Sequence, residues 1–357
     1  MDKKILIVSP ALVYGGGETY LLQLNNILNQ LGFITEFIVS NERLFTNLEC
    51  NNKRLIVAKT QHIAALKSIF LIRKILKENQ YDFVILNGLS EIGVFSNFIP
   101  HDKIIVIGHS NEEWLTYKPY HRGILHALKR VVSYRFDKKL FLFVALNDIT
   151  VSNTRLYGDL YKKTVKIYTG IEEINIVNES DPSIISFGRI GRLIEKKGNR
   201  NLIKAFSFIH KIYPNTKLVF AGDGYKRKKL EQLAKDLDIS HSVMFMGVVN
   251  PRQFYSKIDC MISPSLSEAF PMILLEAMSS RVPIISTSVG GCTEILVDGK
   301  TGRLVSPNSV LELQEAMVDY IQNKEIYKKF SEEAYGVYLS KFSMCSFLKQ
   351  WEKVLKS

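Results

Sequence analysis

The sequence has no long apolar run, few cysteines and no low-complexity segment. Its longest uninterrupted apolar run, Leu140–Leu146, is about a third of a membrane span. Its N-terminus begins a strand at once and has no small-residue cleavage site, so we expect no signal peptide. The four cysteines lack CxxC or histidine-paired spacing, which favours reduced thiols in a cytoplasm over a zinc site. They are Cys50, Cys260, Cys292 and Cys345.

The net charge of +12 suggests anionic partners, but it is not concentrated in one domain. Residues 1–175 carry +6 and the remainder also carries +6, which argues against a nucleic-acid-binding domain. The excess is locally dense in Lys118–Lys139, where seven Lys/Arg accompany one Asp. This stretch is either a solvated helix face or a basic amphipathic surface that docks on anionic lipid.

Short β-branched runs alternate with helical patterns along the whole chain, as in parallel sheets covered by helices. One series of strands lies between residues 4 and 147, and a second begins near residue 183. Residues 64–80 read as a helix with apolar residues near 3.6 spacing: Leu66, Ile69, Phe70, Ile72 and Leu76. The sequence therefore predicts an α/β protein with two doubly wound domains, whose ligand binds at the carboxyl ends of the strands in the cleft between them.

A glycine-rich turn, Gly15–Glu18, follows the first strand and opens the first helix. Glycines there let the backbone approach an anion at a helix N-terminus. A dinucleotide fingerprint would need a further glycine where this chain has Tyr20, so that interpretation fails, and a tight turn explains the motif equally well. His109 ends a later strand of the same half, where a structural and a functional role are both open.

A basic loop opens the second half of the chain. In the segment 186–198, Arg189, Arg192 and Lys197 follow a strand in a loop bounded by glycines. Arginine presents a planar fork to phosphate oxygens and lysine a mobile charge, so together they suit a diphosphate. Taken alone, the loop also fits a solvated basic surface.

The segment 265–278, SLSEAFPMILLEAM, places Glu268 and Glu276 eight positions apart. A strand precedes Glu268, and Pro271 stands at a favourable first helical position. Carboxylates accept hydrogen bonds from sugar hydroxyls, and the helix N-terminus between them suits a phosphate. The alternative is a buried paired acid at Glu276 and a helix-terminal charge at Glu268. Another glycine turn, Gly290–Gly291, follows the next strand.

Taken together and in this order, these motifs resemble glycosyltransferase family 4, the large bacterial group of retaining glycosyltransferases with the GT-B fold. The resemblance covers nearly all of the chain and is most specific in its second half. It implies two Rossmann-like domains facing across a cleft: an acceptor-binding domain at 1–170, a nucleotide-sugar donor-binding domain at 171–340, and a C-terminal helix at 341–357 that crosses back to the first domain.

The resemblance implies catalytic and donor-binding roles for the charged residues of the second domain. Arg189 and Lys197 would neutralise the donor diphosphate as it departs. Glu276 would hold the ribose hydroxyls, and Glu268 would contact hydroxyls of the transferred sugar.

Other positions follow from the same resemblance. Gly224 and Val249 would lie near the base, and Gly16 and Gly17 would close over the phosphates from the first domain. His109 would touch the sugar or the acceptor.

The chain departs from the family pattern in two places. The family often has glycine at Pro271, where a backbone N–H can bind the donor sugar; proline has none, so Ala269, Phe270 or Met272 must supply such a contact. Family spacing to the lysine fits Arg189 or Arg192; we prefer Arg189 because it ends the strand directly.

The resemblance thus implies a retaining glycosyltransferase that moves a sugar from a nucleotide-sugar to a glycan, expected to be lipid-linked, in surface-polysaccharide synthesis. It would work in the cytoplasm or at the inner face of the membrane, with no cofactor, no metal and no nucleic acid. The alternatives are a nucleotide-sugar 2-epimerase of the same fold and a non-catalytic nucleotide-sugar-binding subunit.

Overall fold

The computed structural model describes residues 3–88, 99–109, 140–155 and 159–356. The chain divides into two compact units: an N-terminal unit of residues 1–170 and 344–357, and a C-terminal unit of residues 171–343. Both are parallel α/β structures, and each is described by itself. The basic stretch Lys118–Lys139 lies wholly outside the described residues.

The described strands of the N-terminal unit form one parallel sheet in the order β3-β2-β1-β4-β5-β6-β7. Their bounds are β1 Lys4–Ser9, β2 Ile34–Val39, β3 Asn52–Leu55, β4 Phe83–Asn87, β5 Ile104–Gly108, β6 Leu140–Ala145 and β7 Thr164–Lys166. The helices are α1 Gly16–Gln30, α2 Glu42–Asn47, α3 Gln61–Glu78, α6 Asp148–Thr154, α7 Asp159–Lys162 and α15 Met344–Lys356. Strands β1, β4 and β5 are buried along nearly their whole length, as expected of a sheet covered on both faces.

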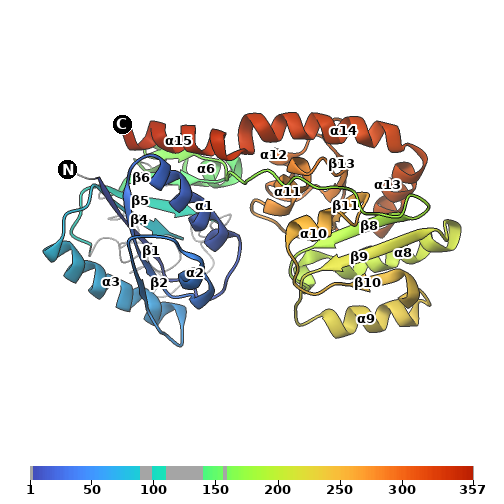
Figure 1. Cartoon of the computed structure of the whole chain (residues 1–357), viewed down its shortest axis with the longest axis horizontal. Helices are drawn as coiled ribbons and strands as arrows, with labels where there is room; N and C mark the ends of the chain where they lie inside the picture. The colour runs from blue at the N-terminus through green and yellow to red at the C-terminus, as the bar shows by residue number, and fades with distance from the viewer. Residues whose placement is uncertain (1–2, 89–98, 110–139, 156–158, 357) are drawn as a thin grey trace. The chain divides into compact units, whose positions relative to one another are not determined.

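Helix α15 comes from the end of the chain and completes the core of the N-terminal unit beside α1 (Figure 1). Phe347 and Trp351 are fully buried, and the Trp351 indole N–H donates to the Tyr20 hydroxyl at 3.2 Å. A Cβ on Gly170 would lie 2.4 Å from the Cβ of Phe347, so the backbone approaches α15 closely there. The core of this unit therefore joins residues more than three hundred positions apart.

The described strands of the C-terminal unit form a second parallel sheet, in the order β10-β9-β8-β11-β12-β13. Their bounds are β8 Ile185–Ile190, β9 Thr216–Ala221, β10 Val243–Phe245, β11 Cys260–Ser263, β12 Ile284–Thr287 and β13 Arg303–Val305. The helices and turns are η3 Glu195–Lys197, α8 Asn199–Ile212, α9 Arg227–Asp236, η4 Ser240–Ser242, α10 Pro251–Tyr255, α11 Met272–Ser279, α12 Cys292–Ile295, α13 Val310–Gln322, α14 Lys324–Val337 and η5 Tyr338–Phe342.

The strand order reverses once in each sheet. Strand β1 lies between β2 and β4, and strand β8 lies between β9 and β11. In open parallel sheets, ligands bind beyond the carboxyl ends of the strands at such a reversal. The fold therefore predicts that ligand-binding residues lie in the loops after β1 and β4 in one unit, and in the loops after β8 and β11 in the other.

One part of the sequence prediction changes on α3. The helix is present, but Leu66 and Phe70 face solvent, with exposed fractions of 42% and 74%. Ala64, Ala65 and Ser68 are buried in their place. A 3.6-residue period alone does not say which side of a helix faces the sheet when apolar residues lie on both sides.

Candidate active site

Arg189 lies at the end of β8, beside the reversal of strand order in the C-terminal unit. Its side chain is 1% exposed and donates from Nη1 to the carbonyl oxygen of Ile190. Its Nε is buried without a hydrogen-bond partner among the described residues. Burial lowers the pKa of this guanidinium, and Glu268 opposes that shift. Arg192, the other arginine of the loop, is exposed.

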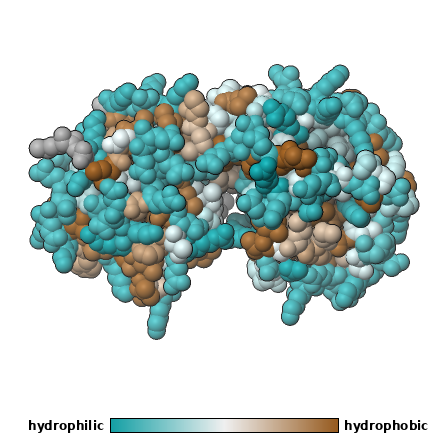
Figure 2. All heavy atoms as spheres, in the orientation of Figure 1, coloured by the Kyte–Doolittle hydropathy of each residue, from teal (hydrophilic) through white to brown (hydrophobic). Residues whose placement is uncertain are grey.

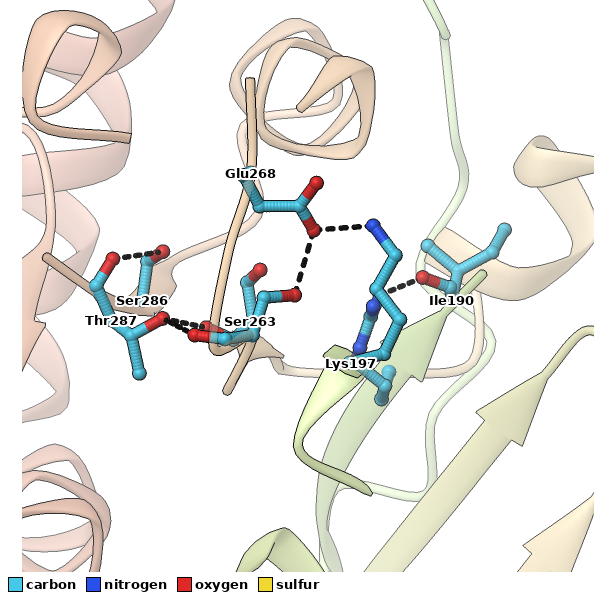
Figure 3. A network of polar contacts seen from close by, with 8 residues as sticks. Ile190, Lys197, Ser263, Glu268, Ser286 and Thr287 are labelled. Atoms are coloured by element: carbon cyan, nitrogen blue, oxygen red, sulfur yellow. Dashed lines mark hydrogen bonds and ion pairs between the residues drawn. The ribbon is translucent and has the colours of Figure 1, made fainter. Parts of the chain in front are cut away.

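Lys197 and Glu268 form an ion pair next to Arg189 (Figure 3). The Lys197 Nζ lies 2.5 Å from Glu268 Oε1, which also accepts from the Ser265 hydroxyl at 2.7 Å. Burial alone would raise the pKa of Glu268, but Lys197, Ser265 and Arg189 together lower it. The pKa of Lys197 is lowered, chiefly by burial. Two cations therefore share one carboxylate, which leaves a net positive charge.

The loop that carries Lys197 packs tightly on the loop after β11. Gly198 has φ +67°, and a Cβ there would lie 1.8 Å from the carbonyl oxygen of Pro264. The Leu266 N–H also donates to the carbonyl oxygen of Lys196 at 2.8 Å. Because the two backbones touch, residues 71 positions apart in sequence are held as neighbours. A side chain at position 198 would separate them.

Small hydroxyl side chains at the ends of β11 and β12 lie beside the loop after β11 (Figure 3). Thr287, the last residue of β12, donates to the carbonyl oxygen of Ser265 at 2.5 Å, and the Ser286 hydroxyl donates to the carbonyl oxygen of Thr287 at 3.2 Å. Ser263 is fully buried. Sequence reasoning did not single out these residues, which end β11 and β12.

Glu276 lies in the second turn of α11, apart from the ion pair. Tyr255, which the sequence analysis did not single out, directs its hydroxyl to Glu276 Oε2 at 3.2 Å and to the carbonyl oxygen of Ile273 at 2.9 Å. Burial raises the pKa of Glu276 to about 7, against the lowering effect of Tyr255. Glu276 thus holds its proton up to near-neutral pH.

The start of α11 differs slightly from the prediction. Pro271 is the N-cap, with φ −77° and ψ 108°, and Met272 is the first helical residue. The Gly291 N–H donates to the carbonyl oxygen of Ala269 at 3.1 Å, and a Cβ at Gly291 would lie 3.1 Å from the Cα of Phe270. The second glycine turn therefore supports the segment Ala269–Phe270 before the helix.

Gly224 and Val249 lie in the loops after β9 and β10, at the same edge of the sheet. A Cβ on Gly224 would lie 2.5 Å from the carbonyl oxygen of Leu193, so the loops after β8 and β9 touch. Val249 is half-buried. Neither residue has a hydrogen bond or ion pair to Arg189, Lys197 or Glu268 among the described contacts, so their predicted place near the base stays a prediction.

His109, Gly16 and Gly17 belong to the N-terminal unit. Gly16 and Gly17 open α1, and the Gly15 N–H donates to Glu18 Oε2 at 2.9 Å. A Cβ on Gly17 would lie 3.4 Å from the His109 ring, so the sequence-predicted glycine and histidine meet.

The polar partners of His109 come from neighbouring strands. Its Nε2 bonds to Asn87 Oδ1, and the Asn87 amide donates to the Ser9 hydroxyl at 3.1 Å. Because a carbonyl oxygen only accepts, Nε2 carries the proton and Nδ1 is the unprotonated nitrogen. Burial lowers the pKa of His109 to about 4, so the ring is neutral at pH 7. Sequence reasoning missed Ser9 and Asn87, which end β1 and β4.

Comparison with known proteins agrees with this geometry. Residues 171–337, nearly the whole C-terminal unit, match the family model "Glycosyl transferases group 1". This part of the chain is therefore similar to the group 1 glycosyltransferases. An uncharacterized glycosyltransferase of Methanocaldococcus jannaschii is 32% identical over 56% of this chain and 53% of its own length. The matched part thus spans about half of that relative.

A second relative matches over most of its length. It is the Campylobacter jejuni enzyme named "GalNAc-alpha-(1->4)-GalNAc-alpha-(1->3)-diNAcBac-PP-undecaprenol alpha-1,4-N-acetyl-D-galactosaminyltransferase", 28% identical over 91% of this chain and 90% of that protein.

Solved structures confirm the fold class. Anabaena HepE in complex with UDP-glucose aligns with a TM-score of 0.79 at 20% identity, over 99% of each chain. A glycosyltransferase from Rickettsia africae aligns with a TM-score of 0.82 at 20% identity, over 99% of this chain and 98% of its own. The predicted GT-B architecture of two Rossmann-like units is therefore confirmed.

Neither a membrane-spanning helix nor a metal-binding cluster of side chains occurs among the described residues. Among the helices that the structure describes, none combines the length and the hydropathy needed to cross a membrane. Within the same ranges, no group of three or more His, Cys, Asp or Glu side chains is arranged to hold a metal ion.

Proposed function

We propose that this protein is a retaining glycosyltransferase that transfers a sugar from a nucleotide-sugar to a glycan acceptor in surface-polysaccharide synthesis. The observation that carries the proposal is the buried cluster of Arg189, Lys197 and Glu268 at the strand-order reversal of the C-terminal unit. Burying two cations against one carboxylate is costly unless a further anion completes the charge balance. A donor diphosphate is such an anion.

In the proposed reaction the bond between the sugar and the diphosphate breaks while the acceptor oxygen bonds to the same carbon on the same face. The acceptor proton passes to the leaving phosphate. Arg189 and Lys197 stabilise the growing charge on the diphosphate in a site that is already arranged for it. When Lys197 turns to the phosphate, Glu268 gains an oxygen to accept from a sugar hydroxyl.

Glu276 and His109 take roles suited to their protonation. Glu276 accepts hydrogen bonds from the ribose hydroxyls, and this favours its ionised form. His109 stays neutral because its pKa is about 4, so it contacts a sugar or acceptor hydroxyl as a hydrogen-bonding group, not as a cation. No metal takes part in this scheme, since the two cations supply the positive charge.

The acceptor is proposed to be lipid-linked, as the name of the Campylobacter jejuni relative describes for that enzyme. The protein would then act in the cytoplasm at the inner face of the membrane. The basic stretch Lys118–Lys139 would attract anionic lipid.

The deciding experiment is a thermal-shift screen against UDP-, GDP- and ADP-sugars, followed by transfer assays with the donor that binds. UDP-glucose comes first, because HepE binds it in a related fold. We expect one nucleotide class to raise the Tm, and Glu276→Ala to remove that shift while the protein stays folded.

NMR of the product distinguishes this proposal from its alternatives. Retention of the donor's anomeric configuration in the product supports it. Conversion at C2 with donor alone would show an epimerase, and donor binding without turnover on any glycan would show a binding subunit.

A further inference from the structure

Helix α3 of the N-terminal unit has apolar side chains that face solvent instead of packing against the sheet. Phe70 is 74% exposed, and Ile63 and Leu66 are each 42% exposed. Their positions three and four apart place all three on one helix face. The adjoining strand-to-helix loop adds Val57, also 74% exposed. Figure 2 shows apolar side chains gathered over the part of the unit where Figure 1 places α3.

The same face is strongly basic. From Asn51 to Lys77 the chain has seven Lys/Arg and no Asp or Glu. On α3 the exposed cations continue the apolar stripe toward the C-terminal end of the helix. They are Lys67, Arg73, Lys74 and Lys77. With about 100° per residue, these four and the three apolar residues fall on one arc about 120° wide.

The opposite face of α3 is the side that packs against the rest of the N-terminal unit. Ala64, Ser68 and Ile72 are fully buried against the N-terminal unit. The helix is thus amphipathic in an unusual sense: its inner face packs on the sheet, and its outer face is apolar and cationic instead of evenly polar. Such a surface is typical of helices that lie on a membrane, where apolar side chains enter the acyl boundary and cations meet headgroups.

We propose that the outer face of α3, here called the α3 face and made of Ile63, Leu66, Lys67, Phe70, Arg73, Lys74 and Lys77, docks the N-terminal unit on an anionic lipid surface. Four exposed cations on α3 against one acidic residue, Glu78 at its end, favour an anionic lipid surface as the occupant over a protein partner, because charged residues are depleted from the core of protein interfaces. This surface is separate in sequence from Lys118–Lys139. The inference rests on the proposed function for its purpose, which is to bring the enzyme to a lipid-linked acceptor.

The test is co-sedimentation of the full chain with vesicles of phosphatidylcholine alone or with about a third phosphatidylglycerol. We expect binding to the anionic vesicles only. The apolar variant Leu66→Ser/Phe70→Ser and the charge variant Arg73→Gln/Lys74→Gln/Lys77→Gln should each lower the partition coefficient at least about 10-fold, since each cation near the surface contributes several-fold.

Matched controls come from the C-terminal unit. The variants Lys228→Gln/Lys229→Gln/Lys235→Gln and Leu311→Ser/Ile326→Ser change equally exposed residues and should bind vesicles like the unaltered protein. Equal loss in these controls, or unchanged binding of both α3 variants, would overturn the proposal. So would an unaltered protein that ignores anionic vesicles, or one that pairs with itself through the α3 face, seen as a dimer that the apolar variant converts to monomer.

Failure of this proposal is distinguishable from failure of the proposed function. Transfer to a soluble acceptor analogue reports on the active site without a membrane, and both α3 variants should retain it. Loss of vesicle binding with intact transfer would separate the two functions as expected. Intact vesicle binding in a protein that binds no nucleotide-sugar would refute the glycosyltransferase and leave the docking surface in place.

Discussion

The two units share one architecture but differ in the chemistry at the carboxyl ends of their strands. In the N-terminal unit, glycines and neutral polar groups lie there: Gly17, His109 and Asn87. In the C-terminal unit the same position in the sheet holds the ion pair of Lys197 and Glu268. The fold thus fixes where a site forms, and the side chains at strand ends fix what it binds.

The difference extends to pH. Burial lowers the pKa of His109 to about 4 and raises that of Glu276 to about 7. Each group is therefore neutral over part of the range in which it would be charged in the unfolded chain. A fall in pH below about 6.5 should weaken the N-terminal unit, and a rise in pH from about 4.5 to 7 should weaken the C-terminal unit, through a single side chain in each.

The largest expected effect is on sugar transfer and distinguishes Lys197 from Arg192, two cations in the loop after β8 of the C-terminal unit. Lys197→Ala should lower kcat for sugar transfer by about 100- to 1000-fold, as loss of a preorganised charge-stabilising group does. Arg192→Ala, an exposed arginine of the same loop, should leave transfer nearly unchanged.

Steady-state assays at saturating donor measure this effect, with circular dichroism as a folding check. Lys197→Met/Glu268→Gln removes the charge left unpaired in the single variant, and should recover stability without recovering transfer. Near-normal turnover of Lys197→Ala would refute the assignment.

The second effect concerns Glu276 and the loss of stability as pH rises to neutral. Because its folded pKa of about 7 exceeds the unfolded value, the folded protein binds more protons, and stability falls as pH rises from about 4.5 to 7. A shift of this size corresponds to about 3 kcal/mol. Glu276→Gln keeps an acceptor for Tyr255 and removes the charge.

We therefore expect Glu276→Gln to have a higher Tm than the unaltered protein at pH 8 and the same Tm at pH 4.5, while it loses donor binding. Differential scanning calorimetry at both pH values checks this. A variant less stable at pH 8 would contradict it.

On the acid side the corresponding group is His109. Its folded pKa of about 4 lies below the unfolded value, so the stability it contributes is present above about pH 6.5 and is lost as pH falls toward 4. His109→Gln should flatten this acid limb by up to about 3 kcal/mol. Urea titrations at pH 5 and pH 7 measure the change in the free energy of unfolding between the two pH values. The same change in the variant and in the unaltered protein would argue against a neutral buried His109.

The smallest effect tests α15. Trp351→Phe removes the indole donor to Tyr20 and leaves that buried hydroxyl without it, at a cost of about 1–3 kcal/mol. Because neither Trp351 nor Tyr20 is among the proposed donor-binding residues, we expect the Tm to fall while donor affinity stays constant. Isothermal titration calorimetry with the donor would expose any loss of affinity.

Much of the fold and part of the site were predictable. Buried β-branched runs at strand spacing and glycine-marked turns predicted both sheets, because burial on two faces leaves a continuous apolar signal. The candidate residues Arg189, Lys197 and Glu268 were named from charged positions in loops after strands and from the family resemblance, and the structure brings the three together.

What escaped prediction depends on long-range contacts. Tyr255 has no local sign that it would meet Glu276, since α10 and α11 are joined only through a strand. Ser265 and Thr287 have no local sign of their role either. The Ser265 hydroxyl donates to Glu268, and the Thr287 hydroxyl donates to the carbonyl oxygen of Ser265. The exposure of Phe70 likewise depends on which side of α3 meets the sheet.

The return of α15 to the N-terminal unit also sets an order of events during synthesis. Residues 171–343 leave the ribosome before Phe347 and Trp351, which fill the N-terminal core. Domains usually fold in the order in which they are made. Here the later unit has all of its sequence while the earlier one still lacks a helix, so the C-terminal unit can fold first and the N-terminal unit is completed only by α15.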